Sequence, residues 1–111
     1  MSSVLESIRR QVGVGEATHF DDEIIPLINA ALLTLVQAGL VINPFIYIMD
    51  DTTLWENIVP STELRDAVRM YVYFSVRLGF DPPSATIIEL IKQQMQELLW
   101  RINHNVEGGT L

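Results

Sequence analysis

The sequence predicts an all-α protein, a small bundle of about four helices with a short extended arm between the second and third main helices. Three long stretches repeat apolar residues every three or four positions, which is typical of helices that pack on one side. Residues that favour helix starts and stops lie at the ends of these stretches. One short run, Phe45 to Met49, is apolar and favours extended structure instead.

A first short helix is expected after Ser2 or Ser3, because either hydroxyl can cap it. Leu5 and Ile8 lie on the side that faces the core. Val12 lies on the same side, and Arg9 and Arg10 lie on the other side.

The stretch from Phe20 to Gly39 is expected to form the central helix. Asp21 is the predicted N-cap, and Gly39 can adopt the left-handed conformation that closes a helix. Pro26 is expected to kink the helix rather than to end it. Asn29 falls on the polar arc, and the rest of the circumference is apolar. The apolar stripe consists of Ile24, Ile25, Ile28, Leu32, Leu35 and Val36.

The extended arm, Phe45 to Met49, follows a turn at Asn43-Pro44. A lone strand cannot satisfy its own backbone groups, so two arrangements are open. The arm packs over its own core, or it pairs with a strand of another chain. A single helical turn, capped by Thr52 or Thr53, is expected after it.

Two further helices complete the bundle. One starts at Ser61 or Thr62 and ends near Gly79, and the last starts after Pro82-Pro83 and runs to about Asn103. The last helix has a seam of apolar residues in steps of three and four, as in helices packed lengthwise. The seam is formed by Ile88, Ile91, Met95, Leu98 and Ile102, and Ile87, Leu99 and Trp100 are expected to widen it. Residues 1–104 are thus one domain, and residues 105–111 a flexible tail.

The formal net charge of −7 argues against a surface that binds nucleic acid through its phosphates. The chain has no cysteine, which excludes disulfides and thiolate chemistry. The first residues lack the pattern of a signal peptide, so we expect synthesis in the cytoplasm. Ile24 to Met49 carries no charge, but its polar residues, Pro26 and its acidic flanks argue against a membrane span.

No motif for catalysis or cofactor binding is found, and we expect neither an enzyme nor a metal site. His19 precedes three acidic residues, but helix capping explains that pattern better than metal binding. Arg65, Arg69 and Arg77 form either a solvated face or part of an ion pair between subunits.

The order of these elements resembles the small helical head–tail connector (adaptor) proteins of long-tailed double-stranded DNA phages and prophages. The likeness extends from Leu5 to Glu107. Its most specific parts are Tyr71-Val72-Tyr73 leading to Phe80-Asp81-Pro82-Pro83-Ser84, and Trp100-Arg101-Ile102-Asn103. Pro26 departs from the family pattern.

The resemblance implies a structural virion protein without an active site. Its ring would lie beneath the portal, extend the DNA channel without specific DNA binding, and dock the next neck protein or a tail terminator. The alternative is a small helical binding or regulatory module that acts as a monomer or dimer. Apolar residues that one small core does not absorb are candidates for contacts between subunits. Exposed acidic residues are candidates for the lining of the ring lumen, where they would repel DNA. The C-terminal tail is a candidate for the contact with the portal. The candidate subunit contacts are Leu33, Phe45, Tyr47, Arg69, Tyr73 and Arg77, the lumen candidates are Asp21, Asp22, Glu23, Asp50, Asp51 and Glu56, and the candidate portal contacts are Asn105, Val106 and Leu111.

Overall fold

The computed structural model describes residues 3–40 and 45–108, with side chains up to residue 104. Within these residues the chain forms helices and no strands, so the all-α prediction is confirmed. The expected turn at Asn43-Pro44 lies outside the described residues. The helices are α1 (Val4–Gln11), α2 (Asp21–Gln37), α3 (Trp55–Ile58), α4 (Thr62–Gly79) and α5 (Ala85–Gly108).

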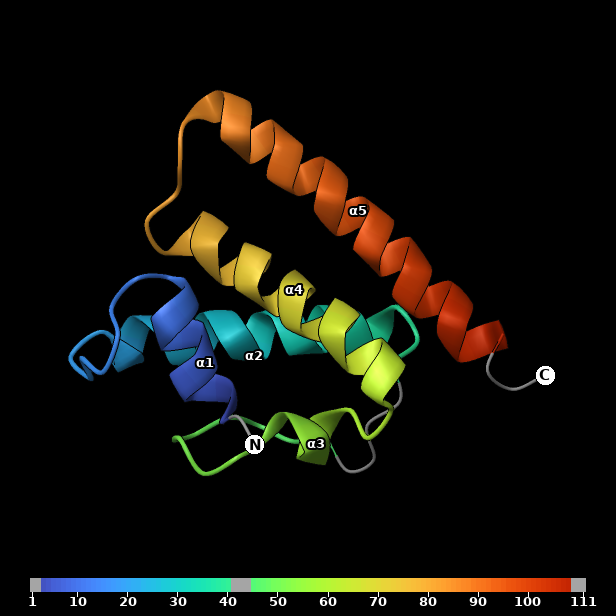
Figure 1. Ribbon diagram of the computed structural model, residues 1–111, viewed down its shortest axis with the longest axis horizontal. Helices are drawn as coiled ribbons and strands as arrows, with labels where there is room; N and C mark the ends of the chain where they lie inside the picture. Colours follow the sequence, from blue (N-terminus) through green and yellow to red (C-terminus); the bar gives the residue numbers. More distant parts are fainter. Residues whose placement is uncertain (1–2, 41–44, 109–111) are drawn as a thin grey trace.

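Helix α4, and not α2, is the centre of the bundle. It packs against α1, α2, α3 and α5, and Figure 1 shows it between α2 and α5. Val68, Val72 and Val76 of α4 are fully buried. The prediction that residues 20–39 form the central helix is therefore wrong, because α2 packs mainly against α4, whereas α4 packs against four other helices.

Helix α1 begins where the sequence predicts. The hydroxyl of Ser3 accepts a hydrogen bond from the Glu6 backbone N–H (3.3 Å), as an N-cap does. Leu5 and Ile8 are buried against the core. The Val4 N–H donates to the Thr53 carbonyl (2.9 Å), which attaches the start of α1 to the segment before α3.

Helix α2 continues through Pro26 to Gln37 and is closed by Gly39 at a φ of 122°. Its first residue is Asp21, and Phe20 takes the N-cap position without a side-chain bond, so the predicted Asp21 cap is wrong. The apolar stripe is confirmed. Its fully buried members are Ile24, Ile28, Leu32 and Leu35.

The short helix α3 is capped differently from the prediction. Thr52 bonds to Asp50, and the N-cap is Leu54, whose N–H donates to the Asn57 side chain (2.9 Å). Ser61 caps α4 as predicted and accepts from the Leu64 N–H (3.4 Å).

Helix α5 packs along α4 through the predicted seam. Ile91, Leu98 and Ile102 are buried there, and Ile88 and Met95 are partly buried. The helix extends to Gly108, beyond the expected end near Asn103. None of the helices within residues 3–40 and 45–108 combines the length and apolar character that crossing a bilayer requires.

Candidate assembly surfaces

The arm from Phe45 to Met49 is fixed to α2 by one side chain. Asn29 donates from Nδ2 to the Ile48 carbonyl (2.9 Å), and its Oδ1 accepts from the Ile48 N–H (2.8 Å). Ile48 is fully buried, and Asn29 is only 4% exposed. The prediction that Asn29 belongs to an outer polar arc is wrong, because the arm covers that side of α2.

The residues beside this clamp point outward. Tyr47 is 61% exposed and Met49 77% exposed. Leu33 of α2 lies one turn after Asn29 on the same face and is 49% exposed. Leu33, Tyr47 and Met49 are called the arm surface below. Phe45 is partly buried and packs edge-on near Tyr47, with ring centroids 6.4 Å apart.

A second surface is a groove beside α5. One hollow of about 470 Å³ is lined by Ala38, Gln96, Leu99, Trp100, Asn103 and His104. An adjoining hollow of about 340 Å³ is lined by Tyr71, Leu78, Lys92, Met95, Gln96 and Leu99. The two share Gln96 and Leu99, so they form one continuous depression, which we call the α5 groove.

Trp100 at the edge of the α5 groove is 65% exposed and stacks on His104, with centroids 4.8 Å apart. The expectation that Ile87 and Trp100 widen the seam is therefore wrong, since both are exposed. Asn103 donates to the Ala38 carbonyl, which connects the groove to the end of α2. No pattern in the sequence indicates this groove, because the groove depends on how α5 is placed beside α4.

The predicted contact residues of α4 are engaged within the subunit. Arg77 donates to the Tyr73 hydroxyl (3.1 Å), and Arg69 lies over the Trp55 ring (5.8 Å). All three predicted contacts on α4, Arg69, Tyr73 and Arg77, are partly buried. Arg65 donates to the carbonyls of the preceding loop. Arg65, Arg69 and Arg77 therefore do not form a simple solvated face on α4, because each contacts a group of its own subunit.

Arg9 is also buried, although it lies on the side of α1 opposite the predicted apolar residues. Its Nε and Nη2 donate to the two carboxylate oxygens of Asp21 (2.8 and 2.6 Å). These hydrogen bonds raise the pKa of Arg9 above its usual value. Asp21 thus joins α1 to α2 and serves as an ion-pair partner rather than as a helix cap.

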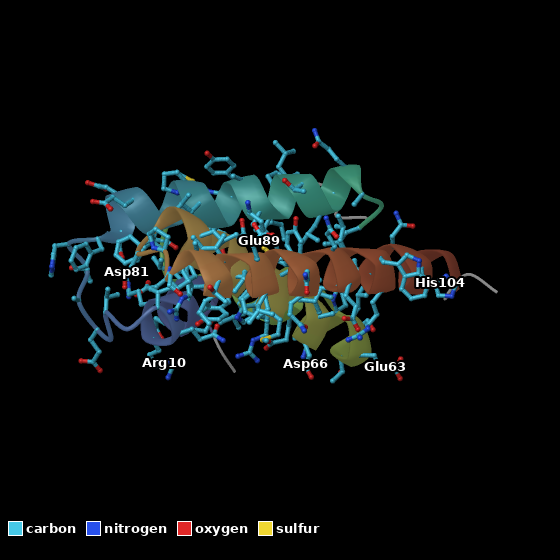
Figure 2. The ribbon with its side chains drawn as sticks, turned by 90° about the horizontal axis from the view of Figure 1, so that it is seen from above. Arg10, Glu63, Asp66, Asp81, Glu89 and His104 are labelled. Atoms are coloured by element: carbon cyan, nitrogen blue, oxygen red, sulfur yellow. The ribbon has the colours of Figure 1, made fainter. Side chains whose placement is uncertain are left out.

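The outer surface is strongly acidic because several basic side chains point inward. Within the described residues, the exposed basic side chains are Arg10, Lys92 and Arg101. Figure 2 shows Arg10, Glu63 and Asp66 along one edge and α2 along the opposite edge. Two hydrogen bonds from Thr52 lower the pKa of Asp50. Among the lumen candidates Asp22, Glu23, Asp50 and Asp51 are exposed, Glu56 is partly buried, and Asp21 pairs with Arg9.

No metal-binding cluster of three His, Cys, Asp or Glu side chains occurs in the described part of the chain. His19 instead packs against Phe20, with ring centroids 4.1 Å apart. The side chains of Asn105 and Val106, and Leu111 as a whole, lie outside the described residues.

Comparison with known proteins gives a family. A family model described as "Phage connector protein" matches residues 4–109, nearly the whole chain. Comparisons with curated proteins and with solved structures gave no significant match. Because the match covers far more than half of the sequence, the chain belongs to the phage connector protein family.

Proposed function

We propose that this protein is a head–tail connector whose copies form a ring beneath the portal, extend the DNA channel and dock the next neck protein or the tail terminator. The family match over residues 4–109 carries this proposal. The protein acts through assembly, at the head–tail junction of the virion, and joins it from the host cytoplasm.

The two surfaces support a ring. Asn29 on α2 holds the arm, and Ala38, the C-cap residue of α2, lines the α5 groove nine residues later. Nine residues are about two and a half helical turns, so the two face opposite sides of the helix. Unlike surfaces on opposite sides favour head-to-tail contacts, which close into a ring when the rotation permits.

The acidic surface supports free passage of DNA. A ring lumen lined by exposed carboxylates such as Asp22 and Glu23 repels phosphates, so DNA moves through it without binding. Residues 105–111, including Asn105, Val106 and Leu111, are the proposed portal contact. Arg69, Tyr73 and Arg77 are further proposed subunit contacts through their partly exposed edges.

Reconstitution with the portal protein of the same phage tests this function. The purified protein should co-sediment with portal rings and appear beneath them in electron micrographs. Leu33→Asp should keep the helical circular dichroism spectrum and abolish the added ring, because it places a charge in an apolar contact. Met70→Asp is the matched control, since Met70 is also exposed but lies outside both surfaces.

A wild-type protein that never associates with the portal or with a tail component contradicts the proposal. An unfolded Leu33→Asp variant would instead show that Leu33 supports the subunit itself.

A further inference from the structure

We propose that the arm surface of one copy occupies the α5 groove of the next copy. This inference rests on the proposed ring and names the two surfaces that meet in it. The occupant is a second copy of this chain, because the protein carries both halves of a complementary contact.

The apolar parts of the two surfaces match. Tyr47 and Met49 project from the arm, and the α5 groove offers Met95, Leu99 and Trp100. The two hydrogen bonds between Asn29 and Ile48 hold the arm in place before any partner arrives. A preorganised arm loses little conformational entropy on binding, which favours association.

The charges match as well. Asp50 and Asp51 follow the arm directly and are exposed. Lys92 lines the α5 groove and is one of the few exposed basic residues of the described chain. An acidic arm is therefore attracted to the groove and repelled by most of the remaining surface.

The spacing of these groups agrees. Tyr47 and Asp50 are three residues apart, which is about 10 Å in extended chain. Leu99 and Lys92 are seven residues apart on α5, which is also about 10 Å along a helix. Tyr47 thus reaches Leu99 when Asp50 lies near Lys92, and Met49 then lies near Gln96.

Disulfide trapping tests the contact without background, because the chain has no cysteine. Met49→Cys and Gln96→Cys are placed in one chain; both positions are exposed, so the fold is retained. Oxidation in the presence of portal rings should give a ladder of covalent dimers, trimers and larger species. An equal mixture of the two single variants should give dimers alone, because each chain then has one reactive end.

The matched control pairs Met49→Cys with Glu63→Cys, an exposed position on α4 at the opposite edge from α2 (Figure 2). This pair should give no ladder. An equal ladder from the control pair, or dimers from Met49→Cys alone at the same yield, overturns the proposed contact.

The two proposals fail in different ways. A double variant that co-sediments with portal rings but forms no ladder refutes the arm–groove contact and leaves the connector function standing. A protein that does not associate with the portal at all overturns both.

Charge reversal provides a second readout on the same ladder. Asp50→Lys and Lys92→Glu should each lower the ladder yield about two- to fivefold, as expected for a partly exposed ion pair. The combination should restore it. Additive losses in the combined variant would show that these two residues do not meet.

Discussion

Helices α2 and α5 lie on two sides of α4 (Figure 1). They differ in which residues they bury. Helix α2 buries an asparagine, Asn29, together with most of its apolar stripe. Helix α5 leaves Leu90 and Trp100 largely exposed. The difference follows from their neighbours, because α2 is covered by α4 and by the arm, whereas α5 makes its main contact with α4. In a subunit made for assembly, exposed apolar residues mark the side where the next molecule belongs.

The largest difference in stability between α2 and α5 variants is expected when an aspartate replaces one apolar residue in each helix. Ile28→Asp in α2 should unfold the protein, with a loss of about 4 kcal/mol or more, because Ile28 is fully buried. Leu90→Asp in α5 should change stability by less than about 0.5 kcal/mol. Urea unfolding followed by circular dichroism measures both. A folded Ile28→Asp protein would refute the assigned packing of α2.

A second contrast concerns two ion pairs. Asp21→Ala leaves the buried Arg9 without its partner and should cost about 3 kcal/mol. Glu97→Ala removes an exposed pair with Arg101 on α5 and should cost less than about 0.5 kcal/mol. Thermal unfolding at low and high salt distinguishes them. Equal losses of unfolding free energy in the two variants would contradict the idea that the buried ion pair contributes more to stability than the exposed one.

The arm clamp should have an intermediate effect. Asn29→Ala leaves the buried N–H and carbonyl of Ile48 unpaired, and we expect a loss of about 2 kcal/mol. Thr34→Ala, which removes an exposed bond to the Ala30 carbonyl, is the control and should be nearly neutral. Faster amide hydrogen exchange at Ile48 in the Asn29→Ala variant, under conditions where the protein stays folded, would show that the loss of stability arises at the arm. Unchanged exchange there would show that the arm is held by other contacts.

The smallest effect concerns pH at the boundary of α4 and α5. Burial raises the pKa of Tyr71 above its ordinary value of 10.0. A raised folded pKa means that stability is fully present below about pH 10 and is lost as the pH rises through the folded pKa. Tyr71→Phe should therefore flatten the decline of the unfolding midpoint between pH 10 and the alkaline limit of the protein. The same slope in both proteins would contradict this.

The sequence was sufficient to predict most helices, because the signals involved are local. The Ser3 and Ser61 caps, the closing Gly39 and the α5 seam each depend on residues within a few positions of one another. Such patterns need no knowledge of the fold.

Long-range pairing could not be predicted in this way. Arg9 and Asp21 are 12 residues apart, and Asn29 and Ile48 are 19 apart. A helical wheel places Arg9 and Asn29 away from the apolar stripe of their helices, because it cannot include a partner from another element. For the same reason the sequence did not indicate that α4 is the central helix or that a groove lies beside α5.

One close contact lies between the end of α4 and the side of α2. A Cβ atom at Gly79 would lie 2.6 Å from Cδ2 of Leu27, so any side chain at this position requires Leu27 to shift where α4 ends against α2. The arm is carried by α2, and the groove lies mainly along α4 and α5, with Ala38 at one end. If the methyl group of an alanine at residue 79 shifts α4 relative to α2, it tilts one surface against the other, and in the proposed ring a small angular error repeated at every subunit prevents the circle from closing. Gly79→Ala should thus favour open arcs or rings of altered circumference.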